Sequence, residues 1–155
     1  MTISRSVSCG LAAGITMFLV GVVFYLLIPI VQPEISPQYQ NADLFRIWSG
    51  WTSIYMVIHP FAYGFVFAAI FVTLRRTTHF PSGVRGGLLY GAGVFVVGSL
   101  PVFLLIFASF QVSAEILVTW VIQSLAQYLS AGMAVGAVAE GKTVCAITRQ
   151  QSPAR

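Results

Sequence analysis

Four long stretches of this chain contain no charged residue, and they constrain the fold more than any other feature of the sequence. They are residues 6–33, 47–74, 86–114 and 116–139, with lengths of 28, 28, 29 and 24 residues. A helix needs about 20 predominantly apolar residues to cross a hydrocarbon core about 30 Å thick. Because each stretch is long enough for one crossing, the sequence predicts an all-α, polytopic membrane protein.

The spans account for nearly the whole chain, so we expect a single integral membrane domain over residues 1–155. Short connections make consecutive spans pack antiparallel, which predicts a four-transmembrane-helix bundle made of two hairpins. The longest connection is 32–49. Its later part, 38–50, has apolar residues at helical spacing, and we expect it to lie on the outer membrane surface as a short amphipathic segment. The expected spans are approximately 8–31, 51–74, 87–110 and 116–139.

The composition excludes several classes of protein. Charged residues make up 8% of the chain and hydrophobic residues 57%, whereas a soluble domain has about 25% charged residues. A soluble enzyme, a nucleic-acid-binding domain and a disordered tail are therefore excluded. The partner that the sequence implies directly is the lipid bilayer.

Basic residues are distributed unequally between the two sides of the predicted bundle. Arg46 is alone on one side, and the other seven lie together on the opposite side: Arg5, Arg75, Arg76, Arg85, Lys142, Arg149 and Arg155. Lysine and arginine are enriched in short cytoplasmic loops. We therefore expect both termini to face the cytoplasm, in a bacterial inner (plasma) membrane. On this topology Cys9 and Cys145 lie on the reducing side and are not expected to form a disulfide.

Aromatic residues gather near one predicted membrane boundary. Trp48, Trp51 and Tyr55 surround the start of the second span, and Trp120 lies near the start of the fourth. Amphipathic rings prefer the headgroup level, so we expect these side chains to anchor the protein at the outer interface.

Small residues mark the predicted helix contacts. Lipid gives apolar helices no hydrophobic drive to associate, so close packing depends on small side chains. The glycines recur at intervals of four and seven residues: Gly10, Gly14, Gly21, Gly87, Gly91, Gly98, Gly132 and Gly136. We expect these glycines to face one another within the monomer, and the alternative is that one set forms a dimer face.

A faint internal repeat accompanies these glycines. Residues 10–28 match 87–105 at an offset of 77 and share the pattern G-L-x-x-G-x-x-x-F-x-V-G. The match is either a duplication or a coincidence between glycine-rich helices. A duplication would relate two parallel hairpins by an axis along the membrane normal.

Polar residues inside the spans are the candidate functional site. Tyr55, His59 and Tyr63 share one face of the second span, and Gln123 and Gln127 share one face of the fourth. An ionisable residue at membrane depth is a functional hypothesis by default. The alternative is structural: a neutral His59 hydrogen-bonds Gln123 or Gln127 and pins two helices together.

Two prolines accompany these polar residues. Pro60 follows His59, and Pro101 lies within the third span. Each removes a helix hydrogen bond and frees a carbonyl, on Met56 and Val97 respectively. Such a kink near the middle of the membrane can open a small polar cavity.

The sequence indicates no catalytic residue, metal site or cofactor. It has one intramembrane histidine, two isolated cysteines and no carboxylate within any span. This set matches none of the short motifs for zinc, phosphate or nucleophilic chemistry. We therefore do not expect an enzyme.

Three hypotheses of function remain, in decreasing order of support. The first is a non-enzymatic accessory subunit or scaffold that docks another membrane subunit or a second copy of the chain. The second is a small-solute transporter or channel, with a polar path at His59, Tyr63, Gln123 and Gln127. The third is a quinone- or lipid-binding redox accessory with His59 as the polar contact.

Overall fold

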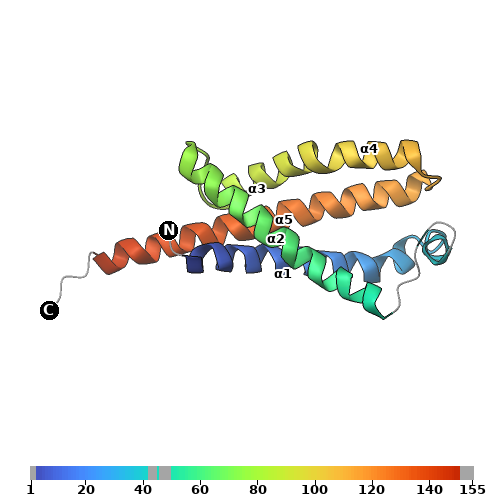
Figure 1. Ribbon diagram of the computed structural model, residues 1–155, viewed down its shortest axis with the longest axis horizontal. Coiled ribbons are helices and arrows are strands. Elements are labelled where there is room, and N and C mark those ends of the chain that lie inside the picture. Colours follow the sequence, from blue (N-terminus) through green and yellow to red (C-terminus); the bar gives the residue numbers. More distant parts are fainter. Residues whose placement is uncertain (1–2, 42–44, 46–49, 151–155) are drawn as a thin grey trace.

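The computed structural model describes residues 3–41, 45 and 50–150, with side chains placed for 6–41, 45 and 50–140. Over these residues the chain is all-helical (Figure 1). Four helical stretches are long and apolar enough to cross a membrane, which confirms the predicted fold class. These stretches are Ser6–Val31, Trp51–Thr77, Gly83–Ser109 and Ala114–Glu140.

The helices extend beyond several of the expected bounds. The elements are α1 (Ile3–Val31), the 3-10 helix η1 (Ser36–Gln40), α2 (Trp51–Thr77), α3 (Gly83–Val94), the π-helix η2 (Phe95–Ser99), α4 (Leu100–Ser109) and α5 (Ala114–Gln150). Helix α1 runs through Pro29 and ends before Pro33, while α5 continues ten residues past Glu140. Of the expected amphipathic segment, 42–44 and 46–49, including Trp48, lie outside the described residues.

The helices pack as two pairs joined by a third contact. Helix α1 packs on α2, and α3 packs on α5, so each pair is one hairpin. The two hairpins meet mainly where α1 lies against α5 (Figure 1). Helix α2 crosses the molecule obliquely and approaches α3 at one end, which we call the α2–α3 end. The opposite end, which carries η1 and the connection between α4 and α5, is the η1 end.

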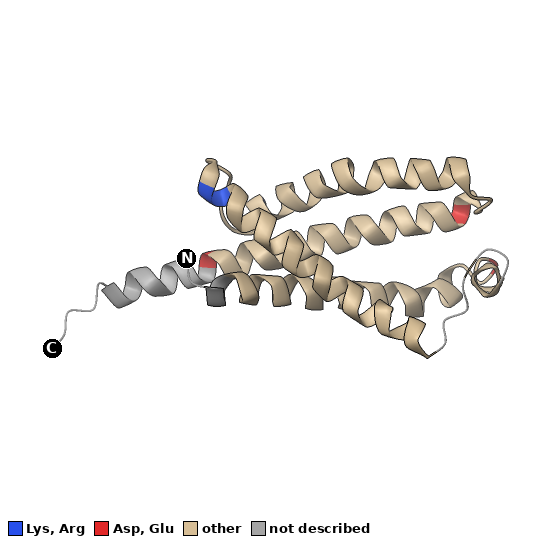
Figure 2. Cartoon of the chain, in the orientation of Figure 1, with Lys and Arg blue, Asp and Glu red and all other residues tan. Residues whose placement is uncertain are grey.

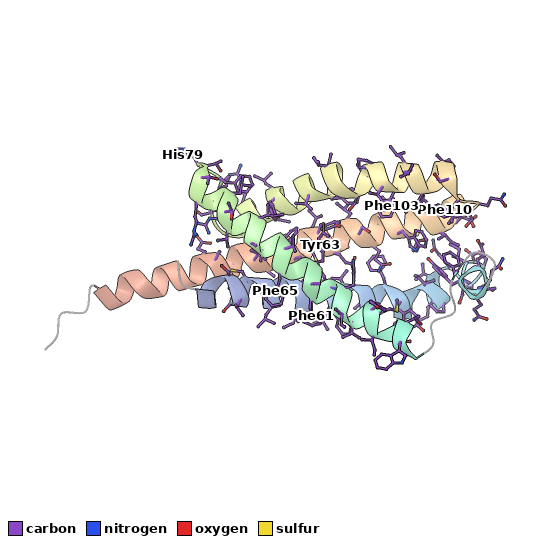
Figure 3. The ribbon with its side chains drawn as sticks, viewed as in Figure 1. Phe61, Tyr63, Phe65, His79, Phe103 and Phe110 are labelled. Atoms are coloured by element: carbon purple, nitrogen blue, oxygen red, sulfur yellow. The ribbon has the colours of Figure 1, made fainter. Side chains whose placement is uncertain are left out.

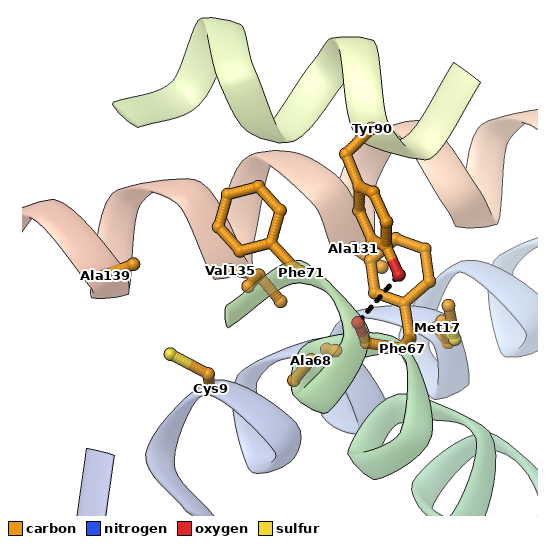
Figure 4. Packing of buried hydrophobic residues seen from close by; sticks show 10 residues of the cluster. Cys9, Met17, Phe67, Ala68, Phe71, Tyr90, Ala131, Val135 and Ala139 are labelled. Atoms are coloured by element: carbon orange, nitrogen blue, oxygen red, sulfur yellow. Dashed lines mark hydrogen bonds between the residues drawn. The ribbon is translucent and has the colours of Figure 1, made fainter. Parts of the chain in front are cut away.

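The buried core lies toward the α2–α3 end. Phe67 and Phe71 of α2 pack against Tyr90 of α3, with ring centroids 4.6 and 5.2 Å apart (Figure 4). Tyr90 donates a hydrogen bond from its hydroxyl to the carbonyl of Phe67, 2.9 Å away, so this buried polar atom is satisfied. The other cluster members come from α1, α2 and α5: Cys9, Ala13, Met17, Ala68, Ala131, Val135 and Ala139.

Glycines bring the backbones of α3 and α5 into direct contact. A Cβ built on Gly87 would lie 2.6 Å from the carbonyl carbon of Gly132, and one on Gly136 would lie 2.8 Å from that of Gly83. On Gly91, a Cβ would collide with the carbonyl of Tyr128. Backbone cannot move aside as the end of a side chain can, so these positions admit only glycine at the observed helix separation.

A second glycine contact joins α1 to α2. A Cβ on Gly64 would lie 2.7 Å from the Cα of Gly14, and one on Gly10 would collide with the ring of Phe65. The sequence does not predict this contact for Gly64, because Gly64 has no glycine partner at the usual intervals in its own span.

Gly98 does not lie at a helix contact, although the sequence predicts one for it. It is exposed, and a Cβ built on it would meet no atom within 4 Å, so the prediction fails for this glycine. The physical reason is the π-helix η2, in which the N–H of Leu100 bonds the carbonyl of Phe95, five residues back. The wider turn shifts the following residues relative to the α3 face that carries Gly87 and Gly91.

Glycines that the 77-residue offset pairs with one another lie only partly in similar helix contacts. Gly10 and Gly14 lie at the contact within one hairpin, as Gly87 and Gly91 do within the other. Gly21 instead lies beside the amide of Gln127, whereas its counterpart Gly98 is exposed. The repeat therefore stays a prediction.

Candidate functional site

The polar residues of α2 lie at the edge of the packed core. Tyr55 is 67% exposed, and His59 is also exposed. The His59 ring lies 6.1 Å from that of Tyr63, one turn further along the helix. Tyr63 is half-buried and faces Tyr128 of α5, with ring centroids 5.6 Å apart. This face of α2 therefore contacts α5 through the aromatic ring of Tyr63.

The glutamines of α5 lie against α1. Gln127 donates a hydrogen bond from its side-chain amide to the carbonyl of Met17, at 3.0 Å. Gln123 approaches the same helix: a Cβ on Gly21 would lie 3.1 Å from the Gln127 nitrogen and 4.0 Å from that of Gln123. Gly21 therefore leaves the room that lets these side chains reach α1.

The five candidate polar residues thus form two groups. Tyr55, His59 and Tyr63 belong to the surface of α2, while Gln123 and Gln127 belong to the α1–α5 contact. In the described part of the chain His59 forms no hydrogen bond with Gln123 or Gln127, and the Gln127 amide donates to Met17 instead. Sequence spacing puts residues on one face of a helix, but it does not tell which neighbour that face meets.

A polar and aromatic cluster at the η1 end was not foreseen. Tyr39 and Phe45 pack against Trp120, with centroids 6.5 and 5.9 Å from its ring. The hydroxyl of Thr119 lies 2.8 Å from the side-chain oxygen of Gln32, and Ile35 and Ile116 are fully buried nearby in the sequence. This cluster holds the segment after α1 on the start of α5.

The interfacial aromatic residues do not share one environment. Trp120 is half-buried beneath Tyr39 and Phe45, whereas Trp51 and Tyr55 are 83% and 67% exposed. Burial raises the pKa of the Tyr39 phenol, and the nearby Trp120 side chain offsets only part of that rise. The Tyr39 hydroxyl is buried with no hydrogen-bond partner in the described part of the chain.

The least packed part of the molecule lies toward the η1 end. Every residue of 51–59 except Thr52 is exposed, so the first turns of α2 lack a buried face. Helix α4 has no buried residue; Leu100, Phe103 and Ile106 are half-buried, at a spacing of three, and the rest of the helix is exposed. Figure 3 shows side chains projecting from the α2 and α4 ribbons and labels Phe103 on α4. We call the exposed residues of 51–59 and of α4 the open surface, which has two parts because α5 and α1 lie between them in the right half of Figure 1.

The open surface is apolar and bulky. On α2 it includes Ile54, Met56, Val57 and Ile58, and on α4 Val102, Leu104, Leu105 and Phe107. Two features at which a helix can change direction mark its inner edge: Pro60 within α2, and η2 followed by Pro101 in the first turn of α4. Proline and π-turns are places where helices change direction. The packed core and the open surface therefore meet at these features.

Among the described residues, no three His, Cys, Asp or Glu side chains come close enough to hold a metal ion. Comparison with known proteins adds no assignment: no family model, curated protein or solved structure matches this chain. The arrangement of its own residues is therefore the basis for a functional proposal.

Proposed function

We propose that the protein is a non-enzymatic accessory subunit that binds another membrane protein, whose transmembrane helices pack on the two parts of its open surface. The observation that carries this proposal is the contrast in burial along α2. The helix contributes Gly64, Phe67, Ala68, Phe71 and Val72 to the buried core, yet residues 51–59 have no buried member. A binding surface requires helix faces that the fold itself leaves free, and this contrast supplies them.

The chemistry of the open surface indicates the kind of partner. In lipid, two helices associate closely when at least one presents small residues. Within this chain such residues are already covered, since Gly10, Gly14, Gly87, Gly132 and Gly136 lie at internal contacts. The open surface has large side chains instead. The fitting partner is a membrane helix with glycine, alanine or serine along one face.

We further propose that both termini face the cytoplasm of a bacterial inner membrane. This places the α2–α3 end at the cytoplasmic leaflet and the η1 end outside. The charge distribution supports it: Arg75, Arg76 and Arg85 flank the connection between α2 and α3, while Glu115 begins α5 at the other end (Figure 2). Lysine and arginine favour the cytoplasmic side of short loops.

A transport path and a redox site have less support from the geometry. A path through His59, Gln123 and Gln127 needs these groups to line one passage. Gln127 is instead engaged with the Met17 carbonyl, and His59 lies on the exposed side of α2. The polar groups therefore favour structural roles.

The test uses photo-crosslinking from the full chain in its native membrane. A photoreactive amino acid is placed at Val57 or Leu104 on the open surface, and at Leu26 of α1 as a matched control, since Leu26 is 60% exposed in the same half of the molecule. We expect both open-surface positions to label the same protein, at a membrane helix with small residues, and Leu26 to label lipid. The labelled protein should also co-purify with the unmodified chain at fixed stoichiometry.

Two outcomes would contradict the proposal. Labelling of lipid alone at Val57 and Leu104 would show that the open surface simply faces the bilayer. Adducts between two copies of the chain at these positions would make it a homo-oligomer contact instead.

A further inference from the structure

Three arginines lie near the α2–α3 end. The rings of Phe71 and Tyr90, with centroids 5.2 Å apart, bring side chains of α2 and α3 together there. Arg75 lies four residues beyond Phe71, and Arg85 lies five residues before Tyr90. At 1.5 Å per residue these arginines are about 6 and about 7.5 Å further toward the end of the molecule. Arg76 follows directly, so all three arginines lie beyond this ring contact toward the same end of the molecule.

These arginines are not neutralised by the fold. The Arg75 guanidinium lies over the Phe71 ring, 5.9 Å from its centroid, and Arg76 and Arg85 are exposed. Within the described residues none of the three forms an ion pair. The acid of this region, Glu140, has its carboxylate against Gly83 instead.

The helix dipoles stabilise the positive charges of two of the arginines but not that of the third. Arg75 and Arg76 are in the last turn of α2, where a positive charge is favourable. Arg85 is in the first turn of α3, where the dipole disfavours a cation. The helix dipole therefore does not stabilise the charge of Arg85, whose side chain is exposed.

The depth of the arginines indicates which anion they meet. Arg75 and Arg76 lie at the end of the apolar stretch Trp51–Thr77, and Arg85 lies near the start of Gly83–Ser109. This is the level at which hydrocarbon gives way to lipid headgroups, and arginine side chains extend toward that level from a helix end. A guanidinium binds phosphate oxygens with two parallel hydrogen bonds.

We propose that Arg75, Arg76 and Arg85 form a binding surface for the phosphate groups of anionic phospholipids in the leaflet around the α2–α3 end. The surface is independent of the proposed partner helices, which lie toward the η1 end. It would enrich acidic lipid around one side of the protein and fix the depth of α2 and α3 in the bilayer.

The test measures lipid retention by native mass spectrometry of the full chain, with phosphatidylglycerol or phosphatidylcholine added to the detergent. Wild-type protein should retain phosphatidylglycerol preferentially. Each arginine near an anionic surface contributes about fivefold in affinity, so R75Q/R76Q/R85Q should weaken phosphatidylglycerol binding by on the order of 100-fold. The charge-preserving R75K/R76K/R85K should keep most of it. Arg46→Gln, which the sequence places on the other side, is the matched control.

Several results would overturn the proposal. Equal retention of phosphatidylglycerol by the wild type and R75Q/R76Q/R85Q would show that the arginines do not contribute to lipid binding. Equal retention of both lipids by the wild type would exclude selectivity for acidic headgroups. Competition by free glycerol phosphate at equal concentration would indicate a soluble anion as the ligand. Circular dichroism establishes that each variant is folded, and single Arg→Gln variants replace the triple one if it is not.

Discussion

Individual glycines decide how closely the helices of this protein approach. Gly91 and Gly93 lie in the same helix, two residues apart, and their surroundings differ completely. A Cβ on Gly91 would lie 2.9 Å from the carbonyl carbon of Tyr128, whereas one on Gly93 would meet nothing within 4 Å. Alanine substitutions at these two positions therefore separate the effect of a tight helix contact on stability from the effect of helix propensity.

We expect Gly91→Ala to lower the free energy of unfolding by about 1–3 kcal/mol, the usual cost of overpacking. Gly93→Ala should be neutral or stabilise the protein by up to about 1 kcal/mol, because alanine favours the helix. Reversible denaturation in mixed micelles measures both. Equal stability of the two variants would contradict the backbone contact between α3 and α5.

Gln127 illustrates a polar residue whose role is structural. Its amide donates to the Met17 carbonyl, and Gln123 one turn earlier makes no hydrogen bond within the described residues. Gln127→Leu should cost about 0.6–1.7 kcal/mol, the range for interhelical hydrogen bonds in membranes, and Gln123→Leu should cost less. The same denaturation assay compares them, and a larger loss for Gln123→Leu would reverse the assignment.

Tyr39 should give the η1 end a dependence on alkaline pH. Burial raises its pKa above 10.0 in the folded protein. Well below pH 10 the phenol is protonated in both states; as the pH approaches and passes 10, the unfolded phenol ionises first, so stability falls. Tyr39→Phe should lose less stability than the wild type between pH 9 and about 11, and should be nearly neutral at pH 7 because the hydroxyl has no partner. Parallel pH profiles for the two proteins would contradict this.

At the scale of elements, the sequence predicts the spans well and their internal irregularity poorly. The uncharged runs mark all four helices because charge is excluded from hydrocarbon. The π-helix at Phe95–Ser99 has no such signal, and it moves Gly98 off the contact that a regular helix would give it. Pro101 accounts for it in part, since proline has no N–H and crowds the carbonyl of Val97.

Replacing that proline tests its role. We expect Pro101→Ala to let η2 tighten into an α-helix. Loss of the extra residue in the π-turn would rotate α4 about its axis by about 100°. A spin label at residue 103, which is half-buried, should then become more accessible to oxygen in the bilayer, and one at the exposed Leu104 less so. Unchanged accessibility at both positions would show that the π-helix does not depend on Pro101.

At the scale of the molecule, the sequence could not predict which helices meet. Every span is apolar around most of its circumference, so periodicity does not select a partner. The glycine contact between α3 and α5 was foreseeable from Gly87, Gly91, Gly132 and Gly136. The separation of His59 from Gln127, and the lack of buried residues in 51–59, follow from the oblique course of α2 and required the structure (Figure 1).

The central claim is that the two parts of the open surface bind helices of a partner protein in the native membrane. Oxygen accessibility of spin labels at residues 57 and 104 tests it most directly, with Cys9 and Cys145 replaced by serine and residue 26 as control. We predict high accessibility at 57 and 104 in bilayers of pure lipid, marked protection of both in native membranes, and no change at 26. Equal accessibility of 57 and 104 in the two membranes would contradict the account.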